Sequence, residues 1–163
     1  PTMSPSMDIQ VASNFERLLF EVYDRDGEAV GGLMANLQTE GGFQLSDRAL
    51  GRARETFDAA RIDEEQTLAT IAEIYRENGV LIDPHTAVGI AAGRARRRDP
   101  AVPLVMLATA HPAKFPQAIT RATGVTPELP PAMSDLLTRP EQFEELTGDL
   151  ATVKAFIRDN VAG

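Results

Sequence analysis

Residues 80–123 read VLIDPHTAVGIAAGRARRRDPAVPLVMLATAHPAKFPQAITRAT, and this stretch decides the fold that we expect for the 163-residue chain. It contains two short apolar runs, at residues 80–82 and 102–108, which we predict to be buried strands. A helix rich in small residues, from about Thr86 to Arg98, lies between them, and another helix runs to about Ala122. A helical crossover between consecutive strands predicts a parallel, right-handed connection.

Polar residues follow both predicted strands, at positions 83–86 and 109–112. In open α/β sheets, ligands bind at the carboxyl ends of the strands, so we expect both polar groups at a ligand-binding edge. Two strands do not make a sheet, however. The other strands must come from residues that this chain does not contain or from a partner; the alternative is a two-stranded appendage on a mostly helical protein.

The apolar spacing elsewhere predicts further helices. We expect them from Ser13 or Asn14, either of which can cap the first one, and then over residues 30–37, 45–62 and 63–78. Asp63 and Gln66 have the spacing of a capping box, and Asn78-Gly79 is a typical helix end. After a proline-bearing link we predict two short helices, of which the last carries Leu150, Val153, Ile157 and Val161.

The composition excludes several classes of protein and site. The chain has no cysteine, which rules out disulfides, thiolate metal sites and a cysteine nucleophile within it. Its net charge of −8 argues against a nucleic-acid partner, and the basic cluster at residues 94–98 is interpreted as the solvated last turn of a helix. No apolar run reaches the ~20 residues that span a bilayer, so we expect no membrane partner. The absence of cysteine fits a cytoplasmic location, which we expect.

Two groups of side chains could carry chemistry. Thr86 can cap the helix that it precedes, and beside it lies His85, one of two histidines. Thr109, His111 and Lys114 place a hydroxyl, an imidazole and an ammonium within six residues. The alternative is that both groups are only turn and cap residues. No third ligand is spaced to join the histidines, so we expect no metal site.

Asn14 and Arg17 lie three residues apart near the start of the first predicted helix. An amide and a guanidinium on one helix face suit a carboxylate or a phosphate, although a cap and a surface arginine would give the same pattern. The sequence has no glycine-rich phosphate loop and no G-x-S-x-G nucleophile elbow.

Three strings resemble segments of the threonine synthase family, and they occur in the family's order. They are TMSPSMDI followed by SNFERLLF (residues 2–9 and 13–20), GVLIDPHTAVG (79–89) and LATAHPAKF (107–115). The family converts O-phosphohomoserine and water into threonine and phosphate, as a lyase of fold type II that uses pyridoxal phosphate. The resemblance implies a C-terminal fragment, α/β in class but mostly helical with a few parallel strands.

The resemblance also implies a domain organisation. We expect residues 1–125 to be the C-terminal part of the cofactor-binding catalytic region and residues 126–163 to be a helical extension. The family motif with the cofactor lysine is absent, and neither Lys114 nor Lys154 matches it. We therefore expect no catalytic residue of that kind here, no covalently held cofactor, and an inactive fragment whose partner is the missing N-terminal part of the same chain.

The resemblance also implies a role for Thr109. In enzymes of fold type II, a serine or threonine hydroxyl at the end of a late strand usually meets the pyridine nitrogen of the cofactor, and Thr109 occupies the matching place. A neutral hydroxyl does not hold that nitrogen protonated as a carboxylate would. The resemblance leaves Asn14, Arg17, His85, Thr86, His111 and Lys114 as candidates for lining the site. The alternatives are another fold-type II lyase or dehydratase, or a helical interaction module without chemistry.

Overall fold

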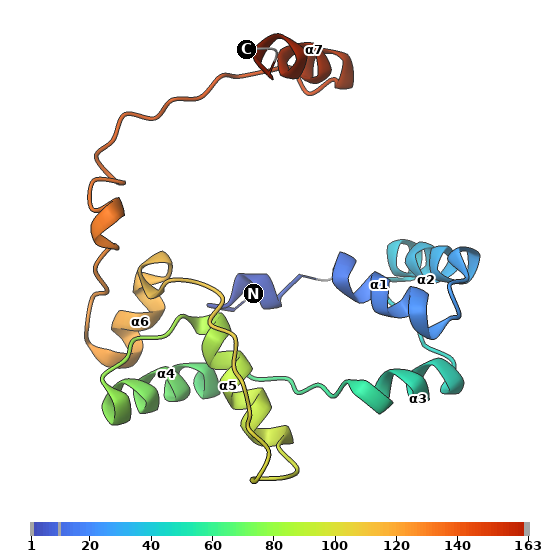
Figure 1. Ribbon diagram of the computed structural model, residues 1–163, viewed down its shortest axis with the longest axis horizontal. Coiled ribbons are helices and arrows are strands. Elements are labelled where there is room, and N and C mark those ends of the chain that lie inside the picture. The colour runs from blue at the N-terminus through green and yellow to red at the C-terminus, as the bar shows by residue number, and fades with distance from the viewer. Residues whose placement is uncertain (1, 10, 162–163) are drawn as a thin grey trace. The chain divides into compact units, whose positions relative to one another are not determined.

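The computed structural model describes residues 2–9 and 11–161, and the chain divides into two compact units between Glu128 and Leu129. Figure 1 labels the α-helices, which occur together with short 3-10 helices. The first unit contains η1 (Pro5–Met7), α1 (Ser13–Val22), α2 (Gly27–Glu40), α3 (Asp47–Thr56), α4 (Glu64–Asn78), α5 (Pro84–Arg96), η2 (Pro112–Lys114) and α6 (Pro116–Thr123). The second unit contains η3 (Pro131–Met133) and α7 (Leu150–Val161).

Neither predicted strand is present, since no residue in the described parts of the chain is assigned to a β-strand. The helical part of the expected fold class is confirmed, and the expectation of a few parallel strands is wrong for this chain. The physical reason is that a strand needs a neighbour to pair with its backbone groups, and residues 80–82 and 102–108 do not pair with each other. Nor is the second run buried, because Val105 is 78% exposed and Leu107 77% exposed.

The 102–108 segment instead lies along α5 without a ladder. A Cβ atom added at Gly93 would come within 2.2 Å of the Met106 Cε atom and 3.5 Å of Leu104 Cδ2. The turn before the segment is closed by Arg97, whose guanidinium donates to the carbonyl oxygens of Pro100 at 2.6 Å and Val102 at 3.0 Å. Gly93 therefore leaves room for the Met106 side chain against α5, and Arg97 fixes the start of the segment.

Helices α4, α5 and α6 enclose a small hydrophobic core in the first unit. Ile71, Ala87 and Ile119 are fully buried there, one from each helix. Leu81 and Ile82 pack against this cluster, so part of the first predicted strand is an apolar connection between α4 and α5. Helix α4 packs against both α5 and α6, so the position of α5 is fixed chiefly by its packing on α4.

Helices α1, α2 and α3 form the other part of the first unit. Leu19 and Val22 of α1 are buried, as is Ala49 of α3. Arg52 of α3 donates to the Val22 carbonyl oxygen at 2.7 Å and pairs with Asp24 at 2.6 Å. These contacts satisfy a carbonyl at the C-terminal end of α1 and join it to α3.

The helix boundaries agree only partly with the sequence prediction. The capping box of Asp63 is confirmed, and α4 ends as predicted at Gly79, which has φ 69°. Helix α2 is longer than residues 30–37, and α3 ends at Thr56 because the next residue, Phe57, is extended. The predicted cap of α1 is wrong, since Ser13 and Asn14 lie inside that helix.

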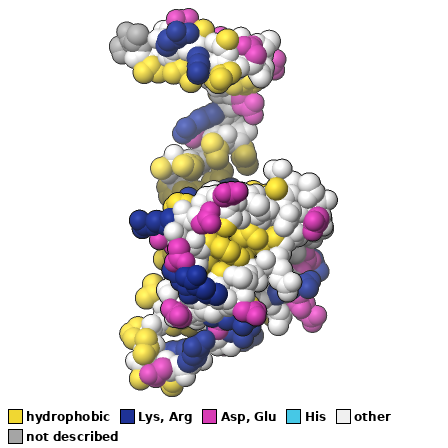
Figure 2. All heavy atoms as spheres, turned by 90° about the vertical axis from the view of Figure 1, so that its right-hand side faces the viewer, with side chains coloured by type: hydrophobic (Ala, Val, Ile, Leu, Met, Phe, Trp, Pro, Cys, Tyr) yellow, Lys and Arg dark blue, Asp and Glu magenta, His cyan; other side chains and the backbone are white. Residues whose placement is uncertain are grey.

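Within the second unit, α7 carries an apolar face that is exposed in this chain. Leu150 is 69% exposed and Ile157 52% exposed, and Figure 2 shows apolar side chains along the surface of this helix. Asp149 precedes the helix and accepts hydrogen bonds from the Thr152 amide at 2.9 Å and the Thr147 hydroxyl at 2.7 Å. In the described residues, no helix combines the length and the apolar character needed to cross a membrane.

The capping box gives a first test. Replacing Asp63 by alanine removes the acceptor of the Gln66 amide at 2.8 Å, and we expect the free energy of unfolding to fall by about 1 kcal/mol. Asp63→Asn also removes the charge but keeps a capping oxygen, so it should stay within about 0.5 kcal/mol of the parent. Urea unfolding followed by circular dichroism measures both, and equal losses would contradict a role for the cap.

A second test concerns pH. Hydrogen bonds from the Thr152 hydroxyl and amide and from the Thr147 hydroxyl lower the pKa of Asp149 to about 2. Because the folded-state pKa is depressed, the stabilisation of α7 is present above the ordinary value of 3.8 and is lost as the pH falls toward 2. A carboxyl carbon-13 NMR titration should therefore place the Asp149 midpoint near pH 2. Asp149→Asn, which keeps a capping oxygen, should abolish this pH dependence of helix content.

Candidate functional site

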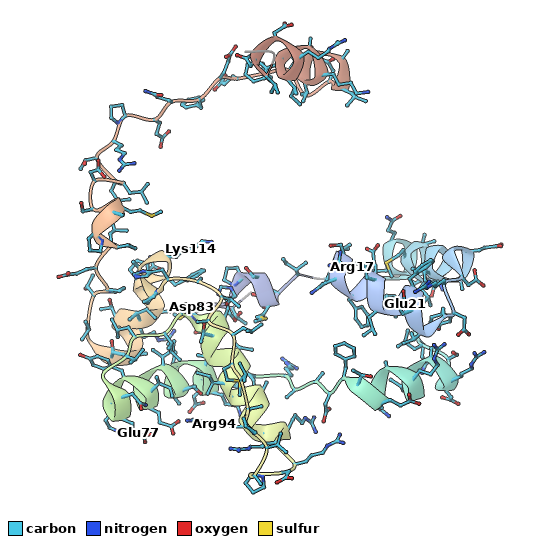
Figure 3. All side chains as sticks on the ribbon, in the orientation of Figure 1. Arg17, Glu21, Glu77, Asp83, Arg94 and Lys114 are labelled. Atoms are coloured by element: carbon cyan, nitrogen blue, oxygen red, sulfur yellow. The ribbon has the colours of Figure 1, made fainter. Side chains whose placement is uncertain are left out.

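The first unit brings together parts of all three strings that were singled out in the sequence. Asp83, at the N-terminal end of α5 in Figure 3, lies at the centre of this arrangement. Its side chain is fully buried, and its Oδ1 accepts hydrogen bonds from the backbone N–H of His85 and from His85 Nδ1, both at 2.9 Å. Its Oδ2 accepts a hydrogen bond from the Thr86 hydroxyl.

Asp83, and not Thr86, is therefore the cap of α5, which begins at Pro84. The prediction that Thr86 caps the helix is wrong, because an N-cap acceptor must precede the first turn and Thr86 already lies inside it. Pro84 fits the first helical position, since it has no N–H to satisfy. The sequence Asp-Pro-His-Thr thus encodes a helix start whose capping carboxylate also binds the next two side chains.

His85 links this helix start to two other parts of the chain. The backbone N–H of Ser6, in η1, donates to His85 Nε2 at 3.1 Å. Nε2 must therefore carry a lone pair, so Nδ1 carries the proton that is donated to Asp83, and the ring is neutral. The ring also packs against Phe115, with the ring centroids 4.7 Å apart.

Thr86 makes the third link. Its hydroxyl donates to Asp83 and accepts the backbone N–H of Thr109 at 3.2 Å. A hydroxyl has one proton and two lone pairs, so both bonds can form at the same time. Thr86 is only 5% exposed, so the hydrogen bond that fixes the Thr109 backbone has a buried acceptor.

The charge of Asp83 is buried without an ion-pair partner among Lys and Arg in the described residues. Three hydrogen bonds to the two oxygens compensate for the lost water, and the N-terminus of α5 adds favourable dipoles. Among the described residues, every buried side-chain nitrogen and oxygen has a hydrogen-bond partner. The network is therefore complete, which makes it costly to disturb at any one member.

The third string presents its candidates at the surface of the chain. Thr109, His111 and Lys114 are exposed, in contrast to the buried His85 and Thr86. His111 Nδ1 accepts the Ala113 N–H at 3.2 Å and thereby caps η2. The Lys114 ammonium lies 5.8 Å from the centre of the Phe115 ring, and Figure 3 shows this lysine just before α6.

The first string packs beside the third. A pocket of about 290 Å³ is lined by Met3 from the N-terminal segment and by residues 114–118. Thr2 and Asp8 close the segment into a turn, with the Thr2 N–H donating to Asp8 Oδ2 at 2.6 Å. That hydrogen bond is the main cause that lowers the pKa of the Asp8 carboxyl.

Asn14 and Arg17 are placed differently from the other candidates. Both are exposed on α1; Asn14 Oδ1 accepts the N–H of its neighbour Phe15, and Arg17 lines a shallow surface pocket between α1 and α2. Within the described residues, no hydrogen bond or ion pair joins either of them to His85, Thr109 or Lys114. The structure thus brings together five of the seven candidates and leaves these two on α1.

The sequence placed Asp83 in the polar group at residues 83–86 but did not make it a site candidate, and it gave no sign of Ser6. The signal for Asp83 was present, because a capping acceptor directly before Pro-His-Thr can reach donors two and three residues later. Ser6 takes part through its backbone N–H, and no side-chain pattern reveals such a contact. In the described residues, no three His, Cys, Asp or Glu side chains are grouped to hold a metal ion.

Three arginines of the basic cluster at residues 94–98 are paired with acids, Arg94, Arg96 and Arg98. Arg94 lies 2.9 Å from Glu73, and Arg98 lies 3.5 Å from Asp58. Ion pairs in which both partners are partly exposed contribute little stability, but they lower the net positive charge of this surface.

Comparison with known proteins identifies close relatives. Residues 86–157 match the profile of the family "Threonine synthase, C-terminal". The chain is 48% identical to the threonine synthase of Pseudomonas aeruginosa and 38% identical to that of Corynebacterium glutamicum, over 96% and 99% of its own length. It spans only 34% of each of those two proteins.

Solved structures agree with these matches. A pyridoxal-phosphate-bound threonine synthase from Brucella melitensis superimposes with a TM-score of 0.82 at 46% identity, over 100% of this chain and 35% of that one. The yeast threonine synthase gives a TM-score of 0.76 at 33% identity, over 99% of this chain and 36% of that one.

The two histidines provide a matched test of the network. His85→Ala removes a donor from a buried carboxylate and the acceptor of the Ser6 amide, so we expect a loss of about 3 kcal/mol in the free energy of unfolding. His111→Ala also removes one backbone acceptor, but on the surface, and should cost less than about 1 kcal/mol. Urea unfolding gives the two values, and hydrogen exchange at Ser6 should rise only in His85→Ala. Similar losses in both variants would contradict the buried network.

Proposed function

The chain is homologous to the C-terminal third of threonine synthases, and we propose that it is that part of an enzyme which converts O-phosphohomoserine and water into threonine and phosphate. The observation that carries the proposal is the junction of all three family-like strings around buried Asp83. The names of the relatives favour this reaction over the dehydratase and interaction-module alternatives.

The residues present fit part of a pyridoxal phosphate site. Thr109 is exposed at the end of an extended apolar segment, and its backbone N–H donates a hydrogen bond to the buried Thr86 hydroxyl. Its hydroxyl is an uncharged donor and acceptor, which suits a pyridine nitrogen that is to stay unprotonated. We propose this contact for Thr109; when bound, the cofactor would supply the electron sink for carbanion chemistry.

A covalent attachment does not fit this chain. Lys114 contacts the ring of Phe115 next to it, and Lys154 lies on α7 in the second unit. Neither of these two, the only lysines of the chain, stands in the matching motif. We propose that residues upstream in a longer protein provide the lysine and the cradle for the cofactor phosphate.

The remaining candidates differ in what they could do for the substrate. His111 and Lys114 are exposed on the same loop as Thr109, where a ring N–H and an ammonium could bind an anionic group. Asn14 and Arg17 could do so from α1. His85 and Thr86 are buried, so we propose that they support the wall of the site without touching the substrate.

The proposal extends to the whole protein. Residues 1–125 would complete the catalytic region, and residues 126–163 would form the helical extension. A cytoplasmic location is inferred from the biosynthetic reaction. The upstream part of the same protein would be the partner that covers the exposed apolar segment at residues 102–108.

Phosphate release provides the test. The longer protein that contains this chain should release phosphate and form threonine from O-phosphohomoserine, only when pyridoxal phosphate is present. Residues 1–163 alone should form none, because the lysine is missing. Thr109→Val, which removes the hydroxyl but keeps the shape, should lower kcat by at least about tenfold. Conversion of threonine or serine to an oxo acid instead of phosphate release would favour the dehydratase.

A further inference from the structure

We infer that Thr86 is a positioning residue for Thr109, and that buried Asp83 orients the Thr86 hydroxyl for this purpose. The inference rests on the proposed contact between Thr109 and the cofactor ring. It assigns a role to a hydroxyl that lies below the site surface and is too buried to touch a ligand itself, being 5% exposed.

The direction of the Thr86 hydroxyl is set by Asp83. The single hydroxyl proton goes to Asp83 Oδ2, so only lone pairs remain to face the rest of the chain. One of them accepts the Thr109 N–H at 3.2 Å. If the carboxylate were absent, the hydroxyl could rotate and direct its proton toward that N–H.

Asp83 itself cannot easily turn. It is fully buried, and the backbone N–H and Nδ1 of His85 both bind its other oxygen at 2.9 Å. His85 is in turn held by the Ser6 N–H at 3.1 Å and by the Phe115 ring. The chain of contacts therefore runs from η1 through α5 to Thr109, with each side chain fixed on two sides.

Thr109 needs such an anchor because the residues before it lack one. Residues 103–108 make no backbone hydrogen bond within the described parts of the chain, and Leu107 is 77% exposed. The bond from Thr86 is thus the first to fix the backbone after a long unpaired run. A site must hold its contacts within roughly 0.5 Å, so an anchor at the backbone of the contacting residue itself is effective.

The experiment uses the longer protein with pyridoxal phosphate. Thr86→Val keeps the shape but removes the hydroxyl, and we expect the dissociation constant for pyridoxal phosphate to rise about fivefold, the equivalent of one hydrogen bond. Hydrogen exchange of the peptide that contains Thr109 should accelerate, and the absorption band of the bound cofactor should shift. Thr86→Ser, which restores a hydroxyl, should stay within about twofold of the parent.

Thr70→Val is the matched control. Thr70 is 7% exposed, and its hydroxyl donates only to the Gln66 carbonyl oxygen of its own helix, at 2.8 Å. It should leave cofactor affinity and spectrum unchanged. Should Thr86→Val fail to fold, Asp83→Asn takes its place, because an amide nitrogen would compete with the Thr109 N–H for the Thr86 oxygen.

The double variant Thr86→Val/Thr109→Val separates positioning from general stability. If Thr86 acts through Thr109, the double variant should bind pyridoxal phosphate as weakly as Thr109→Val alone, within about twofold. Fully additive losses, or an unchanged affinity and exchange in Thr86→Val, would overturn the inference. If neither Thr109→Val nor Thr86→Val changed the affinity for pyridoxal phosphate, the proposed contact between Thr109 and the cofactor ring, on which this inference depends, would be wrong.

Discussion

Burying a carboxylate requires donors for its oxygens, and the arrangement around Asp83 follows from that requirement. The donors belong to His85 and Thr86, two and three residues further along the chain, so the residues that start α5 also compensate the buried charge. His85 and Thr86 each have an acceptor left for a second hydrogen bond. His85 Nε2 accepts the N–H of Ser6, 79 residues away in the sequence, and the Thr86 hydroxyl accepts the N–H of Thr109, 23 residues away.

A separate constraint governs the surface of the chain. Segment 102–108 is apolar, extended and without a pairing strand in the described residues, and α7 has an apolar face of its own. In α/β enzymes such a segment is buried as a strand between neighbours. The chain spans about a third of its relatives, so the proposed upstream part offers a source of those neighbours. Helices α2, α3, α4 and α5 form without it because a side chain within a few residues caps each of them, and a small core holds α4, α5 and α6 together.

These two constraints divide the candidate site into layers. The inner layer, Asp83, His85 and Thr86, carries one compensated charge and is buried, with at most 5% of each residue exposed. The outer layer, Thr109, His111 and Lys114, is exposed and carries donors. A rigid buried support below an open loop is the arrangement that places a few functional groups precisely, since the backbone of the loop is fixed while its side chains remain free.

The sequence by itself determined what depends on near neighbours along the chain. The capping box of Asp63, the helix end at Gly79 and the small-residue helix after Asp83 were all predictable, because their hydrogen bonds close within four residues. The family was recognisable for a different reason, because the amino-acid order of three unusual segments resembles that of the family. Only the tertiary structure decided that the apolar runs are not strands here, and that His85 and Thr86 are buried links while Asn14 and Arg17 stay on α1. Those outcomes depend on which distant backbone groups come within hydrogen-bond reach, and no local pattern encodes that.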